Sequence, residues 1–147
     1  MSRFLSLTSL MLVLCISAAR AEPMYIVTED SKPLGLPFSD AVVVNGLLVM
    51  SGQLGVDTKT FKLVPGGIEA ETTQIFTNMK ALLAEHGADY SDIVKCTVMI
   101  ADIGQWPAFN TLYLKYFPEH KPARSAFGAN GLALNAAVEL ECWAALD

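Results

Sequence analysis

A single arginine, Arg124, remains in the chain outside its first 21 residues, and it is the first candidate for chemistry. It lies in the run Lys121-Pro122-Ala123-Arg124-Ser125-Ala126. Arginine is well suited to gripping a carboxylate, because its planar guanidinium donates two parallel hydrogen bonds. The alternative is a surface residue or half of a structural ion pair, which contributes little to stability when exposed.

Two carboxylates, Glu139 and Glu141, follow Arg124 on the next predicted strand. If that strand pairs antiparallel with the strand of Arg124, the side chains of Arg124 and Glu139 can share one face of the sheet. Such a pair is either a cross-strand ion pair or a site where Arg124 binds a substrate carboxylate and Glu139 holds a water. A nearby guanidinium favours the ionised carboxylate, which suits a water-orienting base. The spacing alone does not choose between Glu139 and Glu141.

The first 21 residues have the features of a secretory signal peptide: Arg3, an uncharged Leu-rich run, and the cleavage site Ala19-Arg20-Ala21. We therefore expect a signal peptide over residues 1–21 and a periplasmic or secreted mature domain over residues 22–147. An uncleaved anchor is the alternative, although the uncharged run is shorter than the ~20 residues of a membrane helix. Lipid attachment at Cys15 is disfavoured because no small residue precedes it.

The predicted mature domain is acidic. Without Arg3 and Arg20 its ten basic residues become 8, against 15 acidic ones, a net charge of −7. These basic residues are scattered, which disfavours a nucleic-acid partner. Cys96 and Cys142 lie in apolar runs, either as small buried side chains or as a disulfide, and the sequence leaves this open. There is no CxxC or HExxH motif, so we expect no metal site.

The elements that position these residues follow from hydrophobic patterning. Residues 41–50, with Asn45-Gly46 in the middle, predict a β-hairpin with a type I′ turn. Helical spacing predicts helices over residues 68–86 and 106–117, the first ended by Gly87. Strands are predicted over residues 93–100, 123–127 and 137–146, whereas residues 22–37 and 57–67 are expected to be irregular.

This order favours one mixed sheet with both helices packed on one face, an α+β fold. Apolar residues occur on both faces of the strand over residues 93–100, which predicts that it is central. Two helices cover only one face, so we expect the other face to pack against a second copy of the chain. The alternative is a face polar enough to meet water.

Several segments, in order and at matching spacing, resemble one family. They are Gly66-Gly67-Ile68-Glu69-Ala70-Glu71-Thr72, Ser91-Asp92-Ile93-Val94-Lys95-Cys96-Thr97-Val98, Pro122-Ala123-Arg124-Ser125 and Val138-Glu139-Leu140-Glu141. From Lys32 to Ala145 the chain is similar to the RidA (YjgF-type) enamine/imine deaminases, so residues 22–147 look like one RidA-like domain. The resemblance implies a chorismate-mutase-like fold and a homotrimer whose sheets form a central barrel, with sites between subunits. It also implies cofactor-free hydrolysis of 2-imino or 2-enamino acids, such as 2-aminoacrylate, to 2-keto acids and ammonia.

The same resemblance implies roles for six residues. Arg124 would bind the substrate carboxylate and Glu139 would orient the attacking water. Phe38 stands where the family often has tyrosine, Asn110 matches an asparagine that lines the cleft, and Gly52 belongs to the loop after the hairpin. These three also have structural interpretations, as packing, helix-stabilising and turn residues. Ala126 stands where many members of the family have cysteine. If only the backbone carbonyl acts, the replacement costs little; if a thiol matters, as in redox-sensitive members, that behaviour should be absent.

The implied chemistry needs positioning and one ordered water, since a protonated imine is already electrophilic. It needs no nucleophile, and Ser125 has no obvious base in the sequence. Two other functions stay open. One is a non-catalytic trimer that binds small carboxylates at Arg124. The other is an endoribonuclease, which the net negative charge disfavours.

Overall fold

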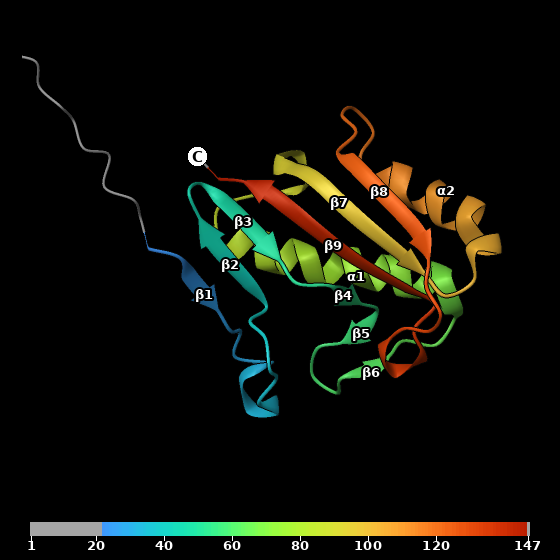
Figure 1. The fold of residues 1–147 in the computed structure, drawn as a ribbon, viewed down its shortest axis with the longest axis horizontal. Coiled ribbons are helices and arrows are strands. Elements are labelled where there is room, and N and C mark those ends of the chain that lie inside the picture. The colour runs from blue at the N-terminus through green and yellow to red at the C-terminus, as the bar shows by residue number, and fades with distance from the viewer. Residues whose placement is uncertain (1–21, 147) are drawn as a thin grey trace, which may run out of the picture.

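The computed structural model describes residues 22–146, so the predicted signal peptide lies outside the described residues. The strands and helices are, in order, β1 (Met24–Ile26), β2 (Ala41–Val44), β3 (Leu47–Met50), β4 (Gln53–Leu54), β5 (Val56–Asp57), β6 (Lys62–Leu63), α1 (Gly67–Glu85), β7 (Ile93–Ile100), α2 (Trp106–Tyr116), β8 (Ala123–Gly128) and β9 (Val138–Ala145) (Figure 1). No helix within residues 22–146 is long and apolar enough to cross a membrane.

One mixed sheet organises the chain, in the order β1-β2-β3-β9-β7-β8, with β4 added beside β9. β7 and β8 are parallel, and the other pairs are antiparallel. The predicted central strand is confirmed, because β7 lies between β9 and β8. The hypothesis that the strands of Arg124 and Glu139 pair with each other is wrong, because β7 separates β8 from β9.

The predicted hairpin is confirmed. β2 and β3 pair with Ala41 opposite Met50 and Val44 opposite Leu47. Asn45 and Gly46 connect them with φ values of 50° and 73°. Both residues are therefore left-handed, as a type I′ turn requires.

Both helices pack on the same face of the sheet, as predicted, and Figure 1 shows α1 behind the strands. The predicted apolar face of α1 is buried, and the helix ends before Gly87, whose φ is 72°. On the sheet side, Cys96 and Cys142 lie opposite each other on β7 and β9, are fully buried, and form a disulfide. The structure thus decides between the two possibilities that the sequence left open.

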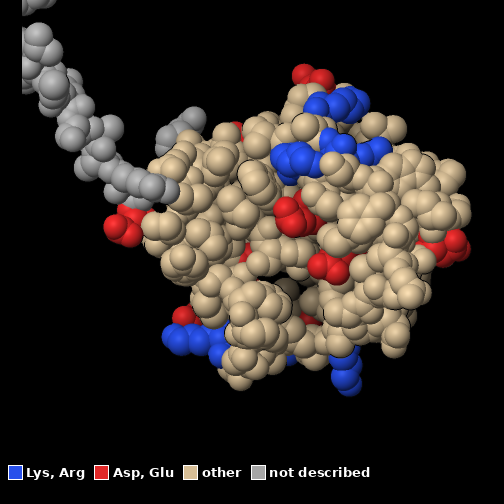
Figure 2. Space-filling view, in the orientation of Figure 1, with Lys and Arg blue, Asp and Glu red and all other residues tan. Residues whose placement is uncertain are grey.

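The opposite face of the sheet, here called the open face, has no helix on it. Tyr25, Val42, Val49, Trp143 and Lys95 lie in register across five strands of this face. Tyr25 is 69% exposed and Trp143 is 38% exposed. Figure 2 shows this face as largely uncharged, with basic side chains gathered near the starts of β7 and β8 and acidic side chains near its centre. A large apolar surface is therefore uncovered in the single chain.

Three local expectations differ from the structure. Residues 22–37 contain β1, which pairs with β2, and residues 57–67 contain β6, which pairs with β5. The sequence pattern of residues 93–100 also predicts side chains that alternate along the whole strand, with Ile93 on the face of Lys95, but the register shifts between Ile93 and Lys95. This irregularity turns Ile93 into the core and leaves Val94 44% exposed.

Candidate active site

Arg124 lies on the edge strand β8, on the face that carries the helices. It is in register with Cys96 of β7, whose side chain is in the core beneath the helices. Its guanidinium Nη1 donates a hydrogen bond to Asn110 Oδ1 of α2 at 2.9 Å. The guanidinium carbon also lies 4.8 Å from the ring centre of Trp106 and 4.7 Å from that of Tyr113.

These contacts hold the guanidinium in a fixed orientation. Cation–π attraction favours a cation over each ring, and the amide oxygen of Asn110 occupies one N–H group. The guanidinium has five N–H donors, so several remain for an anion. Arg124 is therefore an oriented, exposed cation with unused donors. It is not half of an ion pair among the described residues, where the two salt bridges join Lys32 to Glu29 and Lys59 to Asp30.

Sequence reasoning missed Trp106 and Tyr113. With Asn110 they are spaced by four and three residues along α2, which places all three on one helix face. Burial raises the pKa of Tyr113 to about 12, an effect that Arg124 opposes. Burial therefore favours the neutral phenol.

Glu139 is positioned by three strands. On β9 it lies opposite Met99 of β7 on one side and opposite Leu54 of β4 on the other. Its carboxylate packs against Gly52. A Cβ atom on that glycine would lie 2.9 Å from Glu139 Cδ and closer still to Oε1, so no larger residue fits without moving the carboxylate. Burial, and secondly the charge of Glu141, raise the pKa of Glu139 above its ordinary value.

Phe38 and Gly52 belong to the same part of the structure as Glu139. Ser51, next to Gly52, donates its hydroxyl to Ser39 O at 2.6 Å and its N–H to Asp40 O at 2.9 Å. The segment after Phe38 is thereby joined to the loop after the hairpin. Phe38 itself is 54% exposed.

The six predicted site residues thus fall into two groups. Asn110 and Ala126 accompany Arg124, because Ala126 follows it by two residues on β8. Phe38 and Gly52 accompany Glu139. Side chains of β9 alternate: Leu140 and Cys142 enter the core, so Glu139 faces the open side.

Arg124 and Glu139 are therefore on opposite faces of one sheet and do not meet within one chain. The expectation that a neighbouring guanidinium favours the ionised Glu139 is wrong for the single chain, since the pKa of Glu139 is raised. Glu141 differs from Glu139 in its contacts, because Glu141 Oε1 accepts a hydrogen bond from the indole of Trp143 at 3.0 Å.

Lys95 is a further residue that sequence reasoning missed. Its ammonium donates to Ser125 Oγ and to Cys96 O, both at 3.0 Å. An ammonium that donates to a hydroxyl orients it and does not remove its proton, so Ser125 is not activated as a nucleophile here. Within residues 22–146 no group of three or more His, Cys, Asp or Glu side chains is placed to hold a metal ion.

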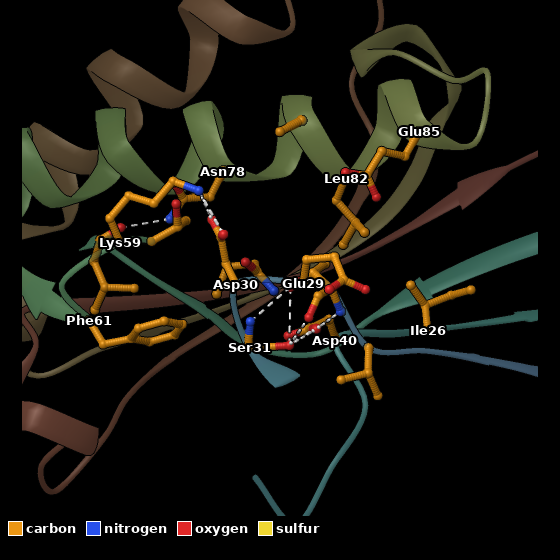
Figure 3. Close-up of a pocket in the computed structure, with 16 residues that line it drawn as sticks. Ile26, Glu29, Asp30, Ser31, Asp40, Lys59, Phe61, Asn78, Leu82 and Glu85 are labelled. Atoms are coloured by element: carbon orange, nitrogen blue, oxygen red, sulfur yellow. Dashed lines mark hydrogen bonds and ion pairs between the residues drawn. The ribbon is translucent and has the colours of Figure 1, made fainter. Parts of the chain in front are cut away.

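A cavity of about 550 Å³ lies elsewhere, between the N-terminal segment, the β5–β6 hairpin and α1 (Figure 3). Asp40 anchors the N-terminal segment there by accepting hydrogen bonds from Thr28 N and Ser31 Oγ. Lys59 pairs with Asp30 at 2.7 Å across the cavity. Neither Arg124 nor Glu139 lines it, so this cavity is not the predicted site.

Comparisons with known proteins agree with this architecture. The sequence profile of the family described as Endoribonuclease L-PSP matches residues 30–146. The chain is 40% identical over 133 residues to Reactive Intermediate Deaminase A, chloroplastic, of Arabidopsis thaliana, which covers 90% of this chain and 71% of that protein. It is 41% identical over 117 residues to a 2-iminobutanoate/2-iminopropanoate deaminase of Capra hircus, which covers 79% of this chain and 85% of that protein.

Solved structures give the same result. YEO7_yeast superposes with a TM-score of 0.79 at 33% identity, over 86% of this chain and 100% of that one. The YjgF gene product of E. coli superposes with a TM-score of 0.74 at 30% identity, over 83% and 98%. Fold and site residues together define an α+β domain of the L-PSP type. The chain belongs to the RidA (YjgF) family, which confirms the resemblance seen in its sequence.

Proposed function

We propose that the protein hydrolyses 2-imino and 2-enamino acids, such as 2-aminoacrylate, to 2-keto acids and ammonia. Curated relatives at about 40% identity are named for reactive-intermediate or 2-iminobutanoate/2-iminopropanoate deamination. The observation that carries the proposal is the guanidinium of Arg124, which two aromatic rings and Asn110 orient. Its remaining N–H groups match the two oxygens of a carboxylate.

The reaction follows from these groups. Arg124 binds the carboxylate, which places the neighbouring imine carbon. As a water oxygen bonds to that carbon, Glu139 accepts a proton from the water and returns it to the nitrogen of the carbinolamine. When the C–N bond breaks, the hydroxyl oxygen forms the C=O bond of the keto acid and its proton passes through Glu139 to the departing ammonia. A 2-enamino acid first takes up a proton at its terminal carbon and so becomes the imine. Burial and Glu141 raise the pKa of Glu139 in the single chain, whereas a guanidinium brought close by a second copy favours its ionised, proton-accepting form. The scheme uses no cofactor.

We further propose that the site is shared between copies in a homotrimer. Since Arg124 and Glu139 face opposite sides of one sheet, one ligand meets both only if the two residues come from different copies. The uncovered apolar open face, with Tyr25 and Trp143 exposed on it, supports an interface there. Asn110 and Ala126 would then line one side of the site, and Phe38 and Gly52 the other.

An exported location would explain why the two cysteines of the predicted mature domain form a disulfide. Disulfides persist in oxidising compartments, and Cys96 and Cys142 form one in the core. This supports the prediction that residues 1–21 direct the chain to the periplasm or the outside of the cell. Mass spectrometry of the exported protein tests it: the expected product begins at Glu22 and carries no free thiol on Cys96 or Cys142, whereas an intact leader would contradict the proposal.

The activity is tested by keto-acid release from imines that an amino-acid oxidase generates, with spontaneous hydrolysis subtracted. Arg124→Ala is expected to lose at least about tenfold in kcat/KM, since it removes a charged, bidentate contact. Equal rates for the two proteins would refute the proposal. If calorimetry shows tight keto-acid binding without rate enhancement, the chain is a carboxylate-binding protein instead.

Mixing inactive variants tests the shared site. Arg124→Ala and Glu139→Gln chains are unfolded together and refolded, so that the copies assort at random. If each site takes Arg124 from one copy and Glu139 from another, about a quarter of the sites regain both native residues. Activity that stays at the level of the separate variants would exclude sharing.

RNA cleavage, which the family description names, has less support from this chain. Its expected net charge of −7 opposes phosphate binding, and its basic residues are scattered. Binding of RNA that weakens steeply with salt would overturn this assessment.

A further inference from the structure

Glu71 is a buried carboxylate in the first half of α1. It is 5% exposed, although the other acidic residue near this helix start, Glu69, is exposed. Glu71 Oε2 accepts a hydrogen bond from the N–H of Ala137 at 2.8 Å, across 66 residues of sequence. No cation pairs with Glu71 among residues 22–146.

A buried carboxylate without a cation is costly, so its single hydrogen bond calls for an explanation. A neutral apolar residue would fill the same space at a lower desolvation cost. What Glu71 adds is a strong, directional bond from α1 to the backbone just before β9.

That backbone leads directly to Glu139. Ala137 precedes β9, two residues before Glu139, and its carbonyl accepts a bond from Ala101 N at 3.0 Å. Ala137 is therefore held from two sides, by Glu71 and by the end of β7. These two hydrogen bonds hold the backbone that enters β9, and the first side chain of β9 to face the open side is Glu139.

The other strand beside Glu139 also meets α1 at Glu71. Gly55 follows β4, and a Cβ atom there would lie 2.6 Å from Glu71 Cβ and 2.8 Å from Glu71 O. The chain after β4 thus packs against the helix backbone itself. One helical residue consequently contacts the segments next to two of the three strands that position Glu139: Ala137 just before β9, and Gly55 just after β4.

We propose that Glu71 is a positioning residue for Glu139, acting through the backbone of Ala137. The inference rests on the proposed function, in which Glu139 orients the attacking water. Glu71 does not touch the substrate. It holds the start of β9 so that the carboxylate of Glu139 stays against Gly52.

The experiment compares Glu71→Ala, Glu71→Gln and Glu69→Ala. Glu71→Gln keeps an oxygen that accepts the N–H of Ala137, and Glu69→Ala removes a carboxylate from the same helix start without a buried contact. We expect Glu71→Ala to lower kcat for imine hydrolysis by about tenfold or more with little change in KM, because Arg124 lies on another strand. Glu71→Gln should recover most of the activity, and Glu69→Ala should match the wild type.

A spectroscopic measurement on folded protein distinguishes an effect of Glu71 on the position of Glu139 from a loss of folded protein. The pKa of Glu139, followed by carboxyl carbon resonances in the folded variants, should move toward its ordinary value in Glu71→Ala and stay raised in Glu71→Gln. Unchanged kcat and an unchanged Glu139 titration in a folded Glu71→Ala protein would overturn the inference. If the wild type itself lacks activity, the proposed function fails, and the titration alone decides whether Glu71 positions Glu139.

Discussion

Replacing Gly52 by alanine should separate function from stability. The backbone of Gly52 has no left-handed φ, so alanine fits its conformation. The new Cβ would lie 2.9 Å from Glu139 Cδ, whereas ordinary contacts begin near 3.4 Å. The atoms it meets are the end of a flexible side chain, so the carboxylate withdraws and the fold is kept.

The size of the effect follows from this displacement. Glu139 Oε1 lies closer to the new Cβ than Cδ does, so the carboxylate oxygen must move by about 1 Å or more to reach an ordinary contact. A misplacement of about 1 Å costs about 100-fold in rate. We expect Gly52→Ala to lose about that factor in kcat for imine hydrolysis, with a thermal midpoint close to that of the wild type. Because Arg124 is untouched, keto-acid affinity should change much less.

Two further variants make the test strict. In a Glu139→Gln background, Gly52→Ala should have little additional effect, since both changes remove the same base. Gly55→Ala is the contrast, because its Cβ would meet the backbone of Glu71, and it should cost stability. A fully active Gly52→Ala protein, or losses that multiply with those of Glu139→Gln, would refute the reasoning.

Three other predictions concern the disulfide and the carboxylates. Replacing Cys96 and Cys142 together by alanine should lower the free energy of unfolding, measured by urea titration, by about 4 kcal/mol. This is the loop entropy that a crosslink across a sequence separation of 46 residues removes from the unfolded chain. A loss below about 1 kcal/mol would contradict this chain-entropy account. Glu141→Gln removes a charge that raises the pKa of Glu139, so the acid limb of the pH–rate profile should move to lower pH; an unmoved limb would exclude Glu139 as the titrating base. Folding raises the pKa of Glu139, so the folded chain favours the protonated carboxyl. The stability that this protonated form contributes is lost as the pH rises through the pKa of Glu139 in the folded chain. Glu139→Gln should therefore raise the thermal midpoint at neutral pH but not well below pH 4.5, and a lower midpoint at neutral pH would contradict this sign.

Elements with strong local signals could be predicted from the sequence. Asn45-Gly46 specifies its turn, and the apolar spacing of α1 specifies its buried face. β1 was missed because a three-residue strand has no pattern of its own and exists only by pairing with β2. The disulfide could not be derived, since the meeting of Cys96 and Cys142 depends on the register of two distant strands.

The order of the strands was wrong at one place for a physical reason. Antiparallel pairing of the strands of Arg124 and Glu139, which are adjacent in sequence, would place these side chains on one face, yet β8 follows β7 through α2. A strand, helix and strand of this kind form a parallel pair, so β8 takes the edge next to β7 and β9 must enter on the other side. That signal was in the sequence, in the helix over residues 106–117.

The site could be predicted only in part. Composition singles out Arg124, but the residues that orient it, Trp106 and Tyr113, look like ordinary core positions of α2. Glu71 could not be identified because, unlike those aromatic residues, its residue type does not fit a buried helix position. It lies on the buried face of α1 beside Ile68 and Thr72, where a charged residue breaks the apolar spacing that indicates burial.

The bond between Cys96 and Cys142 also has a topological consequence. It closes a ring of polypeptide that contains α2, β8 and the first half of β9, and therefore Asn110, Arg124 and Glu139. The largely exposed loop over residues 129–135 lies within this ring and is the kind of segment that proteases cut. One cut there severs a peptide bond but releases no fragment, so the piece that carries Arg124 and the piece that carries Glu139 stay covalently joined.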